Sequence, residues 1–399
     1  MNCTPSEFMQ YIEDEDIKFV RLTFCDIYGV TKNISVMVND IERVLKEGLP
    51  FNASFIKGFD EESTPDLYLH PDPGTTALLP WRPENGKVIR MFCDIKTHSG
   101  EPVKRYSRYI LKEAIRRAEE KGISFKFGSR MEFYLFKTDE EGNSTKIPCD
   151  RAGYMDIAPL DKGENVRREI CLTLERMGVI PVNSHHEAGP GQNEIDFRSS
   201  DALTAADHTM TFRNVVRTIA ARHGFSANFD PKPLDDAPGS GFHINFRADS
   251  ADGKQVQPAA IAGVLKHVYE STLFFNPSAD SYKRLGEGSA PRYITWSREN
   301  RGQLIGIPPV RGIHHYAQLR SPDGLSNPYL DYALIIEAAM DGINSDLELE
   351  PPVNSTADAS IIRKRLPADL KEAIKAAEES EFIKKLFDDY ILKCYSEDR

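Results

Sequence analysis

A Gly-Pro-Gly turn near the middle of the chain constrains the fold more than any other stretch. It separates Glu187 from Glu194 within the sequence HHEAGPGQNEIDF at positions 185–197. A seven-residue spacing would stack both carboxylates on one helix face, but the turn interrupts any helix. We therefore predict two short extended arms across a tight loop, with the carboxylates converging. Paired carboxylates beside imidazoles bind hard divalent cations such as Mg²⁺. A polar loop with solvated acids is the alternative.

Composition limits the class of protein. A chain of 399 residues predicts two domains, one of them small. Its net charge of −11 argues against a nucleic-acid-binding surface and weakly against an anionic membrane. Six cysteines without a C-x-x-C pair favour neither a zinc site nor disulfides. Because there is no apolar run of about 20 residues and no secretory signal at the amino terminus, we expect a reduced, cytoplasmic protein.

The first hundred residues predict a small sheet domain. Its predicted extended segments are 18–24 and 32–38, which flank a glycine turn, and 76–79 and 88–93. The polar stretch 96–100 is the predicted boundary, so the domains are residues 1–100 and 101–399. A short amphipathic helix is expected at 7–14.

Beyond this boundary, helices alternate with strands. Amphipathic or buried helices are predicted at 109–121, 165–177, 204–222, 258–275 and 329–340. The tail, residues 366–395, alternates acidic and basic residues and predicts two exposed helices. Helices interleaved with strands indicate a mixed α/β unit.

Three predicted strands carry unusual polar faces. In residues 125–136 the period-2 alternation separates Met131, Phe133 and Leu135 from polar residues on the opposite face. The polar sets of the three strands are Arg130, Glu132 and Tyr134; His243, Asn245 and Arg247; and Tyr316, Gln318 and Arg320. Any antiparallel strand alternates in this way, so each set alone is more often structural. Together, single Glu, His, Gln and Arg residues beside glycines suit a concave site for a polyanion held with a metal.

The order of motifs resembles the glutamine synthetase (glutamate–ammonia ligase) family, bacterial type, over nearly the whole chain. The matching motifs are Phe24-x-Asp26-x-x-Gly29 with Lys32-Asn33, Leu79-Pro80-Trp81, Cys93-Asp94, residues 185–194, Gly239-Ser240-Gly241-Phe242-His243, Ser281-Tyr282-Lys283-Arg284-Leu285, Trp296-Ser297 with Asn300-Arg301, Arg320-Ser321-Pro322-Asp323 and Asn327-Pro328-Tyr329-Leu330.

This resemblance implies an α+β fold: an N-terminal beta-grasp domain and a C-terminal catalytic α/β domain. It implies active sites between neighbouring subunits of stacked hexameric rings, usually a dodecamer. The family's reaction uses ATP to convert the glutamate side-chain carboxylate into an acyl phosphate, which ammonia then attacks. Two divalent metals, Mg²⁺ or Mn²⁺, neutralise the phosphates and the carboxylate.

The resemblance assigns roles to residues of this chain. For the metal it implies Glu132, Glu187 and Glu194, with His243 from a second metal site. For the amino-acid substrate it implies Gly239, Arg284 and Arg320; for ATP it implies Arg301, with Asn245 and Arg130 beside it. Arg284 and Arg301, together with Asn52 and Ser289 in the nucleophile pocket, are the candidate catalytic residues. The arginines suit bidentate binding of carboxylate or phosphate.

The second metal site departs from the family pattern. Its two glutamates are replaced by Arg130 and Gln318. Because a guanidinium repels a cation, we predict that only one metal is bound. Arg130 then either takes over phosphate neutralisation as a fixed charge or fills a site that no longer works.

The nucleophile and phosphate positions also depart. Asn52 replaces the acid of the ammonium pocket, Ser289 stands where a glutamate closes the site, and the flap is one residue shorter. Glu287 is two positions away. A buried ammonium without an anionic partner is unfavourable by several kcal/mol, so ammonia is a poor candidate nucleophile.

Two phosphate-side arginines are replaced as well. Gly306 stands at the position of one, and the Thr-Arg pair that contains the other reads His315-Tyr316. Each lost contact costs on the order of 2–4 kcal/mol of transition-state stabilisation. Arg311 offers a partial substitute.

Two functions follow from these residues. The first is an ATP-dependent ligase that joins the side-chain carboxylate of a glutamate-like amino acid to an amine other than ammonia. The second is a degenerate homologue with a binding, regulatory or structural role. The retained Glu132, Glu187, Glu194 and arginines favour the ligase.

Overall fold

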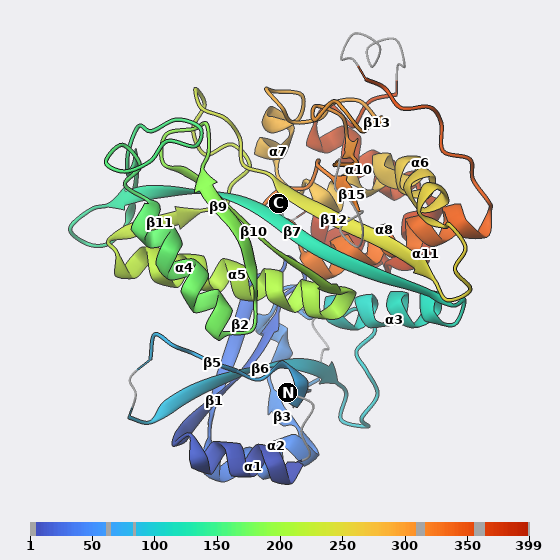
Figure 1. The fold of residues 1–399 in the computed structure, drawn as a ribbon. Helices are drawn as coiled ribbons and strands as arrows, with labels where there is room; N and C mark the ends of the chain where they lie inside the picture. Colours follow the sequence, from blue (N-terminus) through green and yellow to red (C-terminus); the bar gives the residue numbers. More distant parts are fainter. Residues whose placement is uncertain (1–4, 61–64, 83–84, 309–315, 355–363, 398–399) are drawn as a thin grey trace.

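The computed structural model describes residues 5–60, 65–82, 85–308, 316–354 and 364–397. Figure 1 shows two parts: a small sheet with two helices lies below a larger sheet, and helices α3 (Ser107–Glu119) and α5 (Ala202–Arg222) of the larger part lie between the two sheets. No described helix is long and apolar enough to cross a membrane. The five cysteines of the described ranges, all but Cys3, are unpaired.

The N-terminal sheet contains the predicted hairpin. Strands β1 (Ile17–Cys25) and β2 (Thr31–Met37) pair antiparallel across the glycine turn. The strand order is β2-β1-β6-β4-β3, with β5 beside β6. The remaining elements are α1 (Pro5–Asp14), α2 (Ile41–Glu47), β3 (Leu49–Phe51), β4 (Leu67–Pro71), β5 (Ala77–Leu78) and β6 (Lys87–Lys96). The sequence missed β4 and the parallel pairing of β1 with β6, since neither is local in the chain.

The larger sheet has the order β13-β14-β15-β12-β7-β10-β9, and β8 and β11 also pair with β7. Its strands are β7 (Ile123–Thr138), β8 (Ser144–Pro148), β9 (Pro181–His186), β10 (Gln192–Asp201), β11 (Phe225–Asn228), β12 (Phe242–Ser250), β13 (Trp296–Ser297), β14 (Ile305–Gly306) and β15 (Ala317–Leu319). Apart from the β13–β14 pair, neighbouring strands are antiparallel. The long strand β7 is therefore the centre of the sheet (Figure 1).

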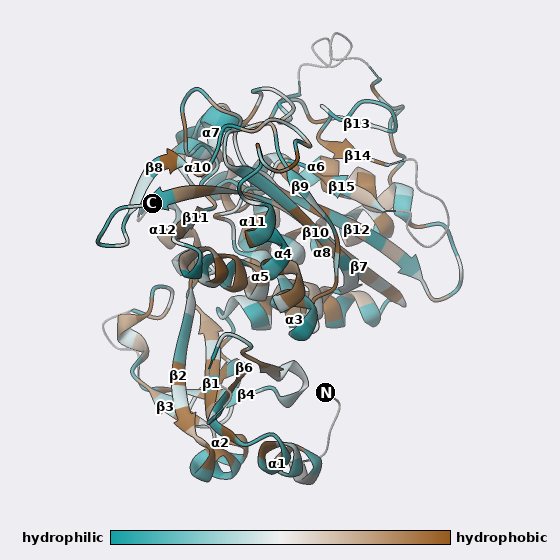
Figure 2. Cartoon of the chain, turned by 60° about the vertical axis from the view of Figure 1, so that its left-hand side comes forward, coloured by the Kyte–Doolittle hydropathy of each residue, from teal (hydrophilic) through white to brown (hydrophobic). Residues whose placement is uncertain are grey.

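All five predicted helices of this part are present. They are α3 (Ser107–Glu119), α4 (Glu164–Arg176), α5 (Ala202–Arg222), α6 (Gln257–Phe275) and α8 (Pro328–Asn344). A further short helix, α7 (Ala279–Arg284), follows α6. In Figure 2 the helices carry both hydrophilic and hydrophobic residues. This mixture is expected when one face of a helix packs on a sheet and the other faces solvent.

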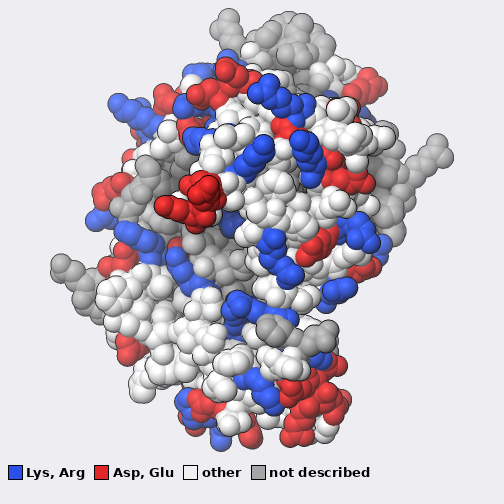
Figure 3. All heavy atoms as spheres, turned by 90° about the vertical axis from the view of Figure 1, so that its left-hand side faces the viewer, with Lys and Arg blue, Asp and Glu red and all other residues white. Residues whose placement is uncertain are grey.

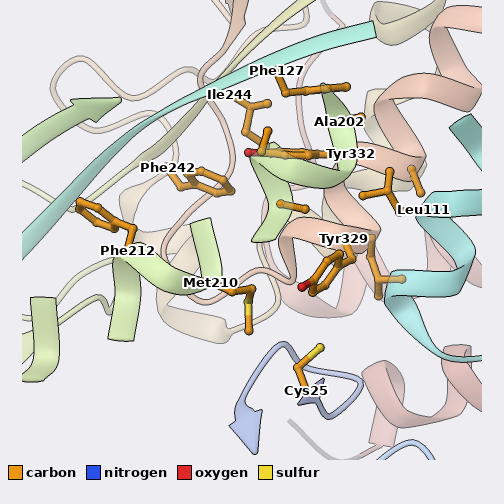
Figure 4. Packing of buried hydrophobic residues seen from close by; sticks show 14 of the residues in the cluster. Cys25, Leu111, Phe127, Ala202, Met210, Phe212, Phe242, Ile244, Tyr329 and Tyr332 are labelled. Carbon is orange, nitrogen blue, oxygen red and sulfur yellow. The ribbon is translucent and has the colours of Figure 1, made fainter. Parts of the chain in front are cut away.

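The apolar side of the larger sheet faces the helices. Met131, Phe133 and Leu135 are fully buried, as the alternation predicted. Phe127 of the same strand stacks on Tyr332 of α8 at 4.4 Å between ring centroids, and Figure 4 shows these rings together above the helices. The polar side chains of the same strands must then point to the other face, where the site lies.

The core continues into the N-terminal part. Cys25 lies at the lower edge of the packed cluster in Figure 4, and the buried residues of both parts form one cluster. Two side chains reach the same carbonyl of the hairpin turn: Asn327 Nδ2 donates to Ile27 O at 2.9 Å and Tyr395 OH at 3.1 Å. The early hairpin motif therefore has a structural role in joining the two parts.

The tail differs from the prediction of two exposed helices. It forms three, α10 (Leu370–Glu379), α11 (Glu381–Leu386) and α12 (Asp389–Glu397). Each buries apolar residues against the catalytic part; for example, Phe387 and Tyr395 both contact Phe274, at 4.6 and 4.7 Å between centroids. The alternating charges line the outer faces and masked this apolar side in the sequence.

Charged residues are mixed over the surface. On the face in Figure 3, Lys and Arg side chains are interspersed with Asp and Glu rather than collected over one element.

A histidine helps to hold α11 in place and makes stability depend on pH. Burial lowers the pKa of His267, but hydrogen bonds to Glu270 (2.9 Å) and Asp341 (2.8 Å) outweigh burial and leave the pKa above 6.5. Its ring stacks on Phe382 at 4.0 Å. Because folding favours the protonated form, its contribution is complete below the unfolded pKa of about 6.5. It is lost as the pH rises through the folded pKa.

We therefore expect the thermal midpoint of the wild type to fall relative to His267→Gln between pH 6 and pH 8.5. Parallel curves for the wild type and His267→Gln would contradict this assignment.

Candidate active site

The Gly-Pro-Gly turn forms as the sequence predicts. Strands β9 and β10 pair antiparallel, with Glu194 opposite His185, and Glu187 N donates to Gln192 O at 2.9 Å to close the loop. Both carboxylates converge on His185, whose Nε2 lies 3.0 Å from Glu187 Oε1 and 3.5 Å from Glu194 Oε1.

A buried pair supports this turn from behind. His186 Nδ1 bonds to Glu187 O at 2.6 Å and its Nε2 to Asp150 Oδ1 at 3.0 Å. The same Asp150 oxygen accepts from Gly191 N at 2.9 Å. The loop that presents Glu187 is thus fixed at both ends. Sequence reasoning did not single out Asp150, which lies far away in the chain.

The predicted metal residues collect in two groups that share Glu194: Glu132 with His243, and Glu187 with His185, each within 4.8 Å. Glu132 accepts from Gly241 N at 2.9 Å and Gln192 Nε2 at 3.2 Å.

The electrostatics of these residues fit a cation. Burial, followed by the charges of Glu194 and Glu187, raises the pKa of Glu132 to about 8. Burial lowers the pKa of His243, and within the described part of the chain its buried Nδ1 has no hydrogen-bond partner. Buried carboxylates that repel one another beside an unpartnered neutral imidazole suit one Mg²⁺ or Mn²⁺ ion.

Arg130 extends into this carboxylate cluster. Its guanidinium forms an ion pair with Glu194, and its Nε lies 3.3 Å from Asp196 Oδ1. The sheet register explains the contact, because Arg130 stands opposite Asp196 on β10 and opposite His243 on β12. No local pattern indicated that Asp196 would take part, since this register is set by tertiary pairing.

The neighbouring polar positions form a connected row. Gln318 Nε2 donates to Asn245 Oδ1 at 2.9 Å, and Arg320 Nη1 donates to Gln318 Oε1 at 3.2 Å. Burial lowers the pKa of the Arg320 guanidinium to about 10, against the charge of Glu132. Its buried Nε has no hydrogen-bond partner among the residues that the structure describes, so Arg320 keeps a free donor for an anionic ligand.

A cavity of about 230 Å³ joins the cluster to the substrate residues. Glu132, Gly239, His243, Arg284 and Ser289 all line it. Arg284 is held by carbonyls, with Nη1 donating to Ser321 O at 2.8 Å and Nη2 to Arg320 O at 3.1 Å. A Cβ on Gly239 would lie 2.7 Å from Arg284 Cγ. The glycine is therefore needed for the close packing of this arginine.

Glu287 is the residue that sequence reasoning undervalued. It was set aside as two positions from the expected glutamate, yet it lines the same cavity as Ser289. Its carboxylate is bound by Lys232, whose Nζ lies 2.6 and 2.5 Å from the two oxygens. The cavity therefore has a flap carboxylate, but one already paired with a buried cation.

Arg320, Arg301 and Asn52 are among the predicted residues that do not line this cavity. Arg301 is exposed in the turn between β13 and β14, although its charge is among those that lower the pKa of Arg320. Asn52 follows β3 in the N-terminal sheet (Figure 1), where its side chain accepts from Ser54 N at 3.0 Å. Arg311 and His315 fall outside the described residues.

A second cavity lies at the other end of β12. It measures about 550 Å³ and is lined by Arg247, Trp296, Ile307 and Tyr316, among others. Because residues alternate along the strand, His243, Asn245 and Arg247 share one face. This face runs from the first cavity to the second.

Comparisons with known proteins agree with this arrangement. The family model described as "Glutamine synthetase, beta-Grasp domain" matches residues 16–98, and "Glutamine synthetase, catalytic domain" matches 104–399. The expected α+β fold class is thereby confirmed. A glutamine synthetase of Methanosarcina mazei is 40% identical, covering 98% of this chain and 93% of that protein. One of Staphylococcus aureus is 41% identical, covering 97% and 92%.

Solved structures agree as well. A GmaS/ADP complex superposes with a TM-score of 0.87 at 27% identity, covering 97% of this chain and 93% of that one. Since both domain models match and curated relatives align over nearly the full length, the chain belongs to the glutamine synthetase family.

Proposed function

We propose that this protein is an ATP-dependent ligase that joins the side-chain carboxylate of a glutamate-like amino acid to a small amine other than ammonia. The observation that carries the proposal is the cavity in which Gly239, Arg284 and Ser289 meet Glu132 and His243. It retains the substrate side of the family's site while the residues toward the nucleophile and the second cation differ.

The reaction requires two displacements. A carboxylate oxygen of the amino acid attacks the γ-phosphorus of ATP, the bond to the β-phosphate oxygen breaks, and ADP leaves. The amine nitrogen then attacks the acyl carbon, phosphate leaves, and the nitrogen loses one proton. We assign Arg284 and Arg320 to binding of the amino acid and the transferring phosphoryl group, and a bound divalent cation would neutralise phosphate charge.

A single divalent cation, Mg²⁺ or Mn²⁺, is the second part of the proposal. Arg130 supplies a fixed positive charge beside Glu194 and Asp196, in the position where the family pattern has a glutamate. A guanidinium there both excludes a second cation and offers donors to a phosphate oxygen. We assign Arg130, Asn245 and Arg301 to the nucleotide side.

The nucleophile is proposed from size and charge. A cavity of about 230 Å³ is smaller than the roughly 300–1,000 Å³ of drug-sized ligand pockets, so only a small amine fits beside an amino acid. Ser289 brings no charge, and the Glu287 carboxylate is already paired with Lys232. An ammonium ion therefore has no unpaired flap anion here.

The proposals of a nucleotide site and of an oligomeric assembly are drawn from similar proteins. A structure of the similar GmaS contains ADP, which supports a nucleotide site in this chain, and the face along β12 leads to a cavity of sufficient size. We further propose a cytoplasmic homo-oligomer of stacked hexameric rings. In that assembly Asn52 would reach a neighbouring subunit's cavity, because it follows β3 of the N-terminal part and does not line the cavity of its own chain.

A second candidate is a catalytically degenerate homologue that binds ligands without turnover. The ion pair between Arg130 and Glu194 favours it, since that pair competes with the cation for one of its ligands.

ADP release with Mg²⁺, ATP and glutamate, measured over a panel of amines, decides between the two. We expect release with at least one small primary amine at a rate above that with ammonia, and loss of release in Glu194→Gln. If no amine leads to ADP release, the ligase proposal is wrong and the degenerate homologue is the function that stands. Faster release with ammonia than with every other amine would overturn the proposed nucleophile.

A further inference from the structure

Lys232 makes an unusual contact beside the substrate cavity. Its side chain is only 5% exposed, while that of Glu287 is 49% exposed. Besides the two Glu287 oxygens, Nζ donates to Ala237 O at 2.7 Å. One buried ammonium thus links the segment 286–290 to the segment 230–241.

The energetics make this contact strong. A buried ammonium is very costly without a charged partner, and among the described residues Glu287 is the one that forms an ion pair with Lys232. Lys232 is fixed by burial, whereas Glu287 lies on a loop at the surface. The charge on Lys232 therefore favours conformations in which this loop lies against the cavity.

Residues of both linked segments line the cavity and form two of its walls. From 230–241 come Ala237, Pro238 and Gly239; from 286–290 come Glu287, Ser289 and Ala290. Each wall is also tied to a substrate residue: Gly239 packs on the Arg284 side chain, and Glu287 N donates to Arg284 O at 3.0 Å. The distance between the walls is set by the ion pair.

We propose that the Lys232–Glu287 ion pair is a latch that holds the segment 286–290 closed over the bound amino acid. Both are positioning residues: they act by enclosing the substrate and by keeping water from the acyl phosphate. The inference rests on the proposed ligase function for its second role, while retention of the amino acid needs binding alone.

The latch is tested first by binding. The dissociation constant for glutamate is measured by calorimetry with a non-hydrolysable ATP analogue and Mg²⁺, on Glu287→Gln, Lys232→Met and the double variant. We expect each single variant to weaken glutamate binding by about tenfold. The double variant should be no weaker than the singles, because partners in one contact are not additive. Affinity for the ATP analogue should stay within twofold.

Asp280→Asn is the matched control, since it removes an equal charge from an exposed pair with Lys283 on the adjacent α7. If Lys232→Met does not fold, Glu287→Gln against Asp280→Asn decides alone. Unchanged glutamate affinity in Glu287→Gln would overturn the latch. So would a double variant whose loss of glutamate affinity equals the product of the two single losses.

The second readout is the coupling between ADP release and amide formation. We expect Glu287→Gln to raise ADP release in the absence of amine several-fold relative to amide formation, because water reaches the acyl phosphate. An unchanged ratio would refute the water-excluding role. A failed ligase shows no ADP release in any variant, yet leaves the binding test intact, so the two failures are distinguishable.

Discussion

Replacing Arg130 with glutamine is expected to lower kcat for ADP formation by a factor of about 100 to 1,000, the usual cost of losing one preorganised donor to a developing anion. Arg130 reaches Glu194 and Asp196 across the β7–β10 pair. In the proposed site it carries the positive charge that a second metal would otherwise bring. Glutamine keeps part of the shape but removes this charge.

The comparison variants separate charge from packing. Arg130→Lys keeps the charge but loses the planar fork, so an intermediate loss is expected. Lys126→Gln removes a positive charge from an exposed position on the same strand and should leave kcat within twofold. Arg130→Gln with undiminished kcat, in steady-state assays with the best amine, would show that Arg130 only fills a disused site.

Replacing Arg108 with methionine is expected to destabilise the fold by about 3–5 kcal/mol, because it leaves buried charge without a partner. The Arg108 side chain is fully buried and contacts three carboxylates: Asp72 at 2.8 Å, Asp94 at 2.7 Å and Asp207 at 3.0 Å. Asp72 and Asp94 belong to the N-terminal part and Asp207 to α5. Arg108 therefore joins the two parts of the chain.

Urea denaturation followed by tryptophan fluorescence measures this loss, since Trp81 lies in one part and Trp296 in the other. Arg116→Met is the matched control: it is on the same helix, α3, but pairs at the surface with Glu113 and Glu120, which is worth at most about 1 kcal/mol. Equal midpoints for the two variants would contradict the assigned role of Arg108.

Local patterns predicted a large part of the site. Period-2 alternation correctly placed Glu132 and His243 on the face away from the core, and the Gly-Pro-Gly turn correctly predicted the approach of Glu187 and Glu194. These features depend on residues close together in the chain, so the sequence contains the information.

Pairing between distant segments was not predictable in this way. Arg130 was expected near phosphate, but its contact with Asp196 depends on a strand register that no local pattern fixes. Glu287 was discounted by counting along the flap, whereas its role depends on a lysine more than fifty residues away. The tail's apolar side was hidden among alternating charges.

The chain belongs to the glutamine synthetase family, but Arg130 and Gln318 stand where the family pattern has glutamates. A cluster with an arginine within it should hold fewer cations than one lined by glutamates alone. We therefore claim that the charge balance of this cluster sets the number of cations it binds.

The most direct measurement of that claim is the number of Mn²⁺ ions bound per subunit, determined by calorimetry in the presence of an ATP analogue and glutamate, with ions carried by the analogue alone subtracted. We expect one bound Mn²⁺ ion per subunit for the wild type and two for the double variant Arg130→Glu with Gln318→Glu. Two ions bound by the wild-type protein would contradict it.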